Sequence, residues 1–573
     1  MIRAAIAVLV LLAFSPSLGS GFVWDDHLQV EHSKTVGHLA NIPGYFSQSV
    51  IEGLAEGEST ADGINLYRPL FSTMLTLTYW VAGGADARAF HAVSLLWHLL
   101  ACLLLFELGL RWLPHRWQSL LAVGFFAFHP VAASGVLFIS AVSEPIAAAL
   151  LFAALLVLDR GCAPDRTVQQ QRWAALVAGC TLLGALLGKE TVLLALPVAT
   201  VTMVLAGRTR ALHHAPLWVA AAVFLTMRFL ALGGLEAAGR PEGSVLRALQ
   251  LSPLIVAESL EALFTLHPTG LRHLGLELGP LGWLGSLVAA GGILLVLLLS
   301  AMARKRMPLA LPTVVLCVLM TAPVALPAAF IGWGGFGRYL YMPAALAALF
   351  LAQAAGILAL RMERSGKTLL LVPLFGVFLV AQQAQLQVAI DDWSSPETLA
   401  SSQVRNAPHL AIGYGWLGEI DLATAEEHVA AGQRAAALQL FEQAVEHFQA
   451  AVDVQPDYHP AFHNLALAQL GSGQPDAALG TLRALETRHG KGPRSSLATA
   501  MSLVALGRPE EAVQRVRWAL ERAPGDSDLL WFLKRLEDPV AQEPPPDLSD
   551  EEVAPSGTPS SSEALAPRST GSP

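Results

Sequence analysis

Long apolar runs alternate with short polar segments through the first two thirds of the chain. A helix needs about 20 consecutive apolar residues to cross a bilayer core. The pattern therefore predicts eleven membrane-spanning helices, several of them short. They cover residues 4–19, 88–110, 118–138, 141–158, 173–187, 191–207, 215–233, 279–302, 308–330, 340–360 and 368–386. The first could instead be a cleaved signal peptide, because the small residues of SPSLGSG follow its apolar run.

Residues 69–83, PLFSTMLTLTYWVAG, are apolar but short for a span. We interpret them as an amphipathic helix on the outer membrane face, inside the first large loop. A twelfth span is the alternative, but it would reverse the side of every later loop.

The composition agrees with a membrane protein. Of 573 residues, 54% are hydrophobic and 14% are charged, whereas soluble domains carry about 25% charged residues. The net charge of -9 argues against nucleic acid as a partner. The four cysteines show no metal-ligand spacing, so neither a disulfide framework nor a zinc site is indicated.

Basic residues are concentrated in alternate loops between the predicted spans. Because short cytoplasmic loops are enriched in Lys and Arg, we assign these loops to the cytoplasm. They contain Arg111, Arg116, Arg160, Arg166, Arg172, Arg208, Arg210, Arg304, Lys305, Arg306, Arg361, Arg364 and Lys367. The first large loop and everything after about residue 387 then lie outside.

The part of the chain after the last span repeats with a fixed period. Gly473 and Gly507 are 34 residues apart, and Ala444, Ala478 and Ala512 are spaced by the same 34 residues. A 34-residue helix–turn–helix period is typical of tetratricopeptide repeats. Such arrays present a concave surface to peptides, and the alternative is a spacer or scaffold without peptide specificity.

The sequence predicts an all-α protein in three parts. Residues 1–387 form a multi-pass membrane domain, and residues 388–538 form an extracytoplasmic domain of about three repeats. A degenerate repeat starts near Trp393, and residues 527–538 cap the array. Residues 539–573 are rich in Pro, Ser and acidic residues and are expected to be disordered.

Ionisable side chains recur at the predicted outer ends of the spans. Such groups in or near a membrane indicate function by default. The candidates are Asp25, Asp26, Arg68, His129, Glu144, Lys189, Glu190 and Arg338. Because all of them are expected on one side of the membrane, we expect them to line one outward-facing cavity.

Simpler roles are open for most candidates; Glu144, for example, could cap its helix and complement the helix dipole. The two acids could be a polar stop after the first span, and His129 before a proline could mark a kink. Lys189 and Glu190 could pair with each other in a tight turn, and Arg338 could bind lipid headgroups.

Together the candidates fit one kind of chemistry. A carboxylate can act as general base on a hydroxyl, and an Arg can hold a phosphate. A cavity open to both lipid and solvent suits a lipid-linked donor and a water-side acceptor. This combination favours glycosyl transfer from a polyprenyl phosphate sugar.

The order of the motifs resembles a known family. FVWDD after an apolar segment, YRPL, FAFHPV with a later Glu, GKET and GRYLYMP precede the repeats. Over about residues 1–535 the chain resembles the transmembrane and tetratricopeptide repeat-containing O-mannosyltransferases, which are GT-C glycosyltransferases. The resemblance implies an outward-facing site, a polyprenyl phosphate-linked sugar such as mannose, a Ser or Thr acceptor, and inversion at the sugar.

The resemblance also implies roles for individual residues. Asp25 and Asp26 match the acidic pair, and we favour Asp25 as the base that deprotonates the acceptor. Arg338 should hold the donor phosphate. The supporting residues are Arg68, His129, Glu144, Lys189 and Glu190. Gly337 and Ser143 depart from the family pattern, in which an acid and an Arg are expected.

No metal is obligatory, because phosphate is already a good leaving group. The two aspartates could nevertheless hold a divalent ion, as in some GT-C enzymes. The expected partners are the lipid-linked donor, an acceptor polypeptide that the repeats could hold, and membrane lipid. The Ala- and Leu-rich composition favours a bacterial inner membrane.

Two other classes of function compete with the enzyme. The first is a non-catalytic, membrane-anchored scaffold whose repeats bind a partner protein. The second is a transporter, which is disfavoured because the charged groups gather at one membrane edge and not at the midplane.

Overall fold

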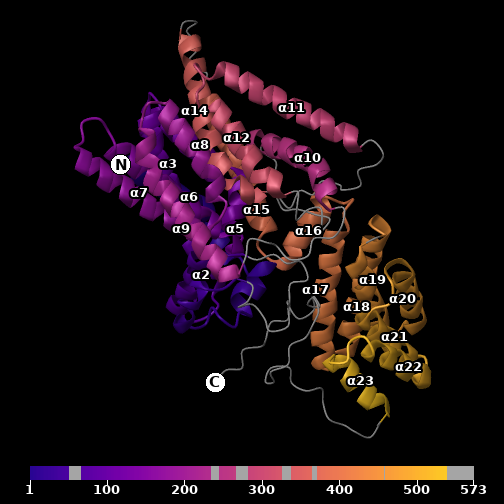
Figure 1. The fold of residues 1–573 in the computed structure, drawn as a ribbon. Helices are drawn as coiled ribbons and strands as arrows, with labels where there is room; N and C mark the ends of the chain where they lie inside the picture. The colour runs from indigo at the N-terminus through magenta and orange to yellow at the C-terminus, as the bar shows by residue number, and fades with distance from the viewer. Residues whose placement is uncertain are drawn as a thin grey trace. The chain divides into compact units, whose positions relative to one another are not determined.

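The computed structural model describes residues 1–50, 66–233, 244–265, 282–324, 337–363, 371–456 and 458–537. Throughout these ranges the regular elements are helices, as Figure 1 shows, so the predicted all-α fold is confirmed. The described residues fall into two compact units, one ending at Ser395 and the other starting at Pro396. The predicted tail at 539–573 lies outside the described residues.

All eleven predicted spans correspond to apolar helices of the first unit. Eight are long and apolar enough to cross a membrane: α1 (Ile2–Phe14, with the turn to Gly19), α3 (Ala87–Trp112), α6 (Ser143–Gly161), α7 (Val168–Gly188), α9 (Ala215–Leu232), α11 (Gly282–Ala303), α14 (Tyr341–Glu363) and α15 (Leu371–Asp392). The other three segments are a bent pair, α4 (Arg116–Phe128) with α5 (Pro130–Leu137), and the shorter helices α8 (Val192–Leu205) and α12 (Ala310–Thr321).

The bend between α4 and α5 follows from one dipeptide. Pro130 has no amide hydrogen to continue α4, and its ring disfavours helical geometry at the preceding residue. His129 is accordingly extended, with φ -69° and ψ 130°. The two helix axes differ in direction by 55°, and the break brings α5 against the turn that contains Arg338.

Two α-helices in the described part of the first unit lie outside the predicted spans. The first, α2 (Pro69–Ala82), is the helix predicted at 69–83, and it packs against α3 and α7. The second, α10 (Ser244–Phe264), lies between the predicted spans 215–233 and 279–302, where no helix was predicted from the sequence. Polar residues and Pro253 interrupt its hydropathy, but Leu251 and Ile255 are buried on one face against α11 and α12.

Two carboxylates form ion pairs with basic residues at the ends of several helices. Asp159, 2% exposed, accepts from Arg111 at the end of α3 and from Arg208, whose Nη1 lies 2.9 Å away. Glu107 pairs in the same way with Arg160 and with Arg3, at the start of α1. These ion pairs place one end of α1, α3 and α6 and the loop after α8 together, so three of the predicted basic loops meet at one end of the bundle.

The second unit is a stack of helical hairpins. The hairpins are α17 (Ala411–Ala430) with α18 (Arg434–Val454), α19 (His459–Gly471) with α20 (Pro475–His489), and α21 (Pro493–Ala505) with α22 (Pro509–Leu520). The terminal helix α23 (Ser527–Glu537) packs on α22 where a cap was predicted. Near Trp393 a single helix, α16 (Pro396–Asn406), replaces the predicted degenerate repeat.

Small residues allow the hairpins to pack closely. Ala444, Ala478 and Ala512, which carry the 34-residue period, are fully buried. A Cβ atom on Gly418 would lie 2.8 Å from the ring of Phe448, so glycine is required where α17 meets α18. The period in the sequence therefore marks the contacts between helices.

Candidate active site

A strained turn follows the first span and presents the two aspartates. Trp24 has φ +53°, a left-handed conformation that is rare for a bulky residue. Its ring stacks on Phe138 at 5.6 Å, and the amide of Gly21 donates to the carbonyl of Ser394 at 2.9 Å. Such strain is found mostly where the surrounding contacts require it, often at functional sites. The same turn carries Asp25 and Asp26, whose environments differ.

Asp26 is a buried structural acceptor. Its Oδ1 accepts from the amide and the hydroxyl of Ser140, at 2.8 and 2.6 Å, and its Oδ2 accepts from the amide of Val23 at 3.2 Å. Burial raises the pKa of Asp26 to about 7, although the hydrogen bonds from Ser140 oppose the shift. The side chain thus fastens the turn to the residues that precede α6.

Asp25 differs from Asp26 in both burial and hydrogen bonding. Its side chain is only half-buried, and none of the described residues donates a hydrogen bond to its carboxylate. Burial raises the pKa of Asp25, and the positive charge of Arg338 opposes that shift. Of the two acids, Asp25 is the one whose oxygens are available to a ligand.

Arg338 projects from the turn before α14 into an aromatic enclosure. Its guanidinium carbon lies 6.0 Å from the ring of Trp24, 5.8 Å from Phe138 and 5.4 Å from Tyr339. Among the described residues it forms no ion pair within 4.0 Å, although it interacts electrostatically with the carboxylate of Asp25. The aromatic faces hold the cation in place without neutralising it.

Lys189 and Glu144 form a buried ion pair. The ammonium contacts Glu144 Oε1, and the two side chains are 2% and 1% exposed. The pair links the end of α7 to the first turn of α6, where a carboxylate also complements the helix dipole. The alternative in which Lys189 pairs with Glu190 is therefore wrong.

Glu190 pairs with Arg68 instead. The guanidinium donates two hydrogen bonds, from Nε at 2.8 Å and from Nη2 at 2.6 Å. Burial favours the neutral acid, but the charge of Arg68 prevails and lowers the pKa of Glu190 to about 2. This fork-to-fork pair joins the start of α2 to the residue that follows Lys189.

Tyr339 connects the cations of the site. Its ring lies 5.2 Å from Nζ of Lys189 and also contacts Arg338. Its position next to Arg338 in GRYLYMP was the sequence signal for this contact. Tyr341, by contrast, is fully buried and bonds to His98 at 2.6 Å.

His129 is separate from this cluster. Its Nδ1 accepts from the amide of Val131 at 3.2 Å, so it caps α5, and its ring packs 4.7 Å from Phe125. No described contact joins it to Arg338 or to either aspartate. Its position agrees with the simpler interpretation of the sequence, in which His129 marks a kink before Pro130.

In the structure, six of the eight predicted residues thus form one cluster of charged side chains. They are Asp25, Arg68, Glu144, Lys189, Glu190 and Arg338, with three positive and three negative formal charges. Asp26 supports the turn, and His129 supports a helix break.

The two aspartates are the predicted donors for a possible metal ion. Within the described ranges no three His, Cys, Asp or Glu side chains lie close enough to hold one. Asp26 already accepts three hydrogen bonds, which leaves few oxygens for a hard cation that prefers six or more ligands.

A comparison with curated proteins finds distant similarity to a glycosyltransferase. No protein-family model matches the chain. A stretch of 200 residues, 35% of the chain, is 28% identical to Protein O-mannosyl-transferase Tmtc2 of Drosophila melanogaster. This stretch covers only 21% of the length of that relative. The chain is therefore distantly similar to a protein O-mannosyltransferase.

Two solved structures also show similarity. A thermophilic tetratricopeptide-repeat protein of Thermus thermophilus is 23% identical, over 32% of this chain and 98% of its own, with a TM-score of 0.23. The hetero-tetramer Cut9–Hcn1 of the APC/C is 15% identical, over 82% of this chain and 90% of its own, with a TM-score of 0.24. Scores this low carry no argument about fold or function.

Proposed function

We propose that the chain is a membrane glycosyltransferase that moves a sugar, mannose or a similar hexose, from a polyprenyl phosphate to a Ser or Thr hydroxyl of a protein. The observation that carries the proposal is the pair of opposite charges at one end of the bundle. Asp25 is free to accept a proton, and Arg338 is free of ion pairs among the described residues. The similarity to Tmtc2 supports the same reaction.

The proposed reaction is a single displacement. The acceptor hydroxyl attacks the anomeric carbon as Asp25 removes its proton, which is general base catalysis. The bond between the anomeric carbon and the phosphate oxygen breaks, and its electron pair stays on the phosphate. The guanidinium of Arg338 stabilises that charge. One displacement inverts the configuration of the sugar.

The other charged residues would hold this geometry. The Lys189–Glu144 and Arg68–Glu190 pairs join α2, α6 and α7. Tyr339 contacts both Lys189 and Arg338. Because both pairs already satisfy their carboxylates, we assign positioning roles to them. Such preorganised charges stabilise the transition state of a transfer reaction, because they need no rearrangement as it forms.

We propose that the site faces away from the cytoplasm. The basic end of the bundle, with Arg111, Arg160 and Arg208, would be cytoplasmic by the positive-inside rule. Arg338 lies in the turn just before α14 and Arg361 lies in the last turn of that helix, so the site would face the opposite side. We assign the protein to a bacterial inner membrane, with the repeats holding the acceptor polypeptide.

A transfer assay separates this enzyme from a scaffold. Purified full-length protein in liposomes would receive radiolabelled mannose on polyprenyl phosphate together with a Ser- and Thr-rich acceptor peptide. We expect wild type to label the peptide and Arg338→Gln to lose most of the activity. Arg166→Gln, which removes an exposed loop cation elsewhere, is the matched control. If wild type transfers no sugar from any lipid-linked donor, the scaffold is favoured and the proposal fails.

A further inference from the structure

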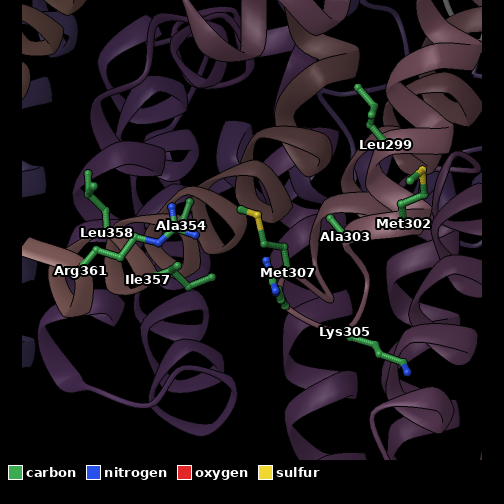
Figure 2. A pocket seen from close by; sticks show the side chains of 10 residues that line it. Leu299, Met302, Ala303, Lys305, Met307, Ala354, Ile357, Leu358 and Arg361 are labelled. Atoms are coloured by element: carbon green, nitrogen blue, oxygen red, sulfur yellow. The ribbon is translucent and has the colours of Figure 1, made fainter.

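A groove of about 690 Å³ lies at the end of the bundle opposite Arg338. Figure 2 shows side chains of α14, among them Leu358 and Arg361, on one side of it, and Leu299 and Met302 of α11 on the other. The complete lining is Leu299, Met302, Ala303, Lys305, Arg306, Met307, Ala354, Ile357, Leu358 and Arg361. Seven of these side chains are apolar, three are cationic, and none is acidic.

The cationic and the apolar residues of the groove lie at different positions along the helices, and therefore at different depths in the proposed membrane. Ala303 ends α11, and Arg361 lies in the last turn of α14, so the cations lie where both apolar helices end. Leu299 and Leu358 lie within the helices, 55% and 47% exposed. Apolar side chains in the membrane with cations at its edge match the two parts of a phospholipid, its acyl chains and its headgroup.

The cations of the groove differ from others at the same end. Arg111, Arg160 and Arg208 are neutralised by Asp159 or Glu107. Lys305, Arg306 and Arg361 are exposed, and in the described part of the chain no acid lies within 4.0 Å of their charged groups. Three cations that converge on one groove without a counter-charge complement an anionic ligand.

We propose that this groove binds an anionic glycerophospholipid. The phosphate would lie against Lys305, Arg306 and Arg361, and an acyl chain would follow Leu299 and Leu358. Basic pockets between helices on the cytoplasmic side of membrane proteins bind such headgroups, and the volume lies within the usual range for ligand sites. Ala354, the lining residue of α14 that is nearest to Arg338 in the sequence, lies 13 residues after the start of the helix, about 20 Å along it, so the groove is distinct from the proposed active site.

Native mass spectrometry of the full-length protein tests the proposal. The protein would be released from detergent with an equimolar mixture of phosphatidylglycerol and phosphatidylcholine. We expect wild type to retain phosphatidylglycerol preferentially. Near a membrane surface each cation strengthens anionic-lipid binding about fivefold, so replacing all three by Gln should weaken binding about 100-fold and abolish the preference.

Two controls decide the outcome. The triple variant Arg166→Gln, Arg172→Gln and Arg210→Gln removes three exposed cations of other basic loops and should keep the preference. Arg361→Gln alone should reduce it about fivefold if the groove triple variant fails to fold. Equal loss in both triple variants, or no loss in the groove triple, would overturn the proposal. Displacement of the lipid by free glycerol phosphate would show that the groove binds a soluble phosphate instead.

Discussion

Removing one partner of the Lys189–Glu144 pair should destabilise the membrane unit strongly. The change is Glu144→Gln, which keeps the shape of the side chain and removes its charge. Lys189 is 2% exposed and would then be a buried cation without its only ion-pair partner among the described residues. Breaking a buried pair in this way costs about 3–5 kcal/mol, because the remaining charge is neither solvated nor compensated.

A double-mutant cycle separates the free energy of the ion pair from the free energy lost through altered packing. Lys189→Met alone should cost a similar amount, since it leaves Glu144 buried and unpaired. The double variant removes both charges, so its cost should be far below the sum of the two single costs. We expect a coupling free energy of about 3 kcal/mol or more from this double-mutant cycle.

The cysteines of the chain provide an assay for this unit alone. All four precede the repeats, and three of them, Cys102, Cys162 and Cys317, are buried. Replacing the exposed Cys180 by Ser leaves only thiols that react with a fluorescent maleimide when the unit opens. Thermal scans should show a midpoint lower by on the order of 5–10 °C for either single variant, and a largely restored midpoint for the double.

One result would refute this reasoning. If Glu144→Gln leaves the midpoint within 1–2 °C of wild type, on the order of the shift that a surface substitution causes, the ion pair does not form in the membrane. Strictly additive single effects would lead to the same conclusion, because two residues in contact should not behave independently.

Four further predictions test other parts of the account. The transfer rate should rise with pH through a pKa above the ordinary 3.8 of an aspartate, because burial raises the pKa of Asp25 and the base must be ionised; Glu190, whose pKa is about 2, cannot produce such a limb. Arg68→Lys keeps the charge but loses the two parallel hydrogen bonds to Glu190, and kcat/KM should fall on the order of tenfold. Washing with EDTA should leave transfer unchanged, and a loss that Mg²⁺ restores would contradict the reaction without a metal. Phe448→Ala should destabilise the repeats by about 3–5 kcal/mol in circular dichroism melts, without shifting the maleimide midpoint.

Patterns local to the sequence predicted much of the fold. Apolar runs located the eleven segments, and the 34-residue spacing of Ala444, Ala478 and Ala512 located the hairpins, because both signals reflect burial of one helix face. The helix α10 was missed because Pro253 and scattered charges lowered its hydropathy, although its buried face is intact.

The candidate site was predicted as a set of residues but not as a set of contacts. Lys189 lies 45 residues from Glu144, and Arg68 lies 122 residues from Glu190, so no local pattern could pair them. The different roles of Asp25 and Asp26 depend on Ser140, which lies 114 residues beyond Asp26. Two adjacent acids look alike in a sequence and are distinguished only by the donors that the fold brings to one of them.

The central claim is that Asp25, and not Asp26, removes the proton of the acceptor. The most direct measurement is the rate of sugar transfer by Asp25→Asn, with donor binding and the maleimide midpoint measured on the same preparation. The account predicts a loss of at least 100-fold in kcat, with the midpoint and donor affinity close to those of wild type, whereas Asp26→Asn should lower the midpoint. Transfer by Asp25→Asn at the wild-type rate would contradict the account.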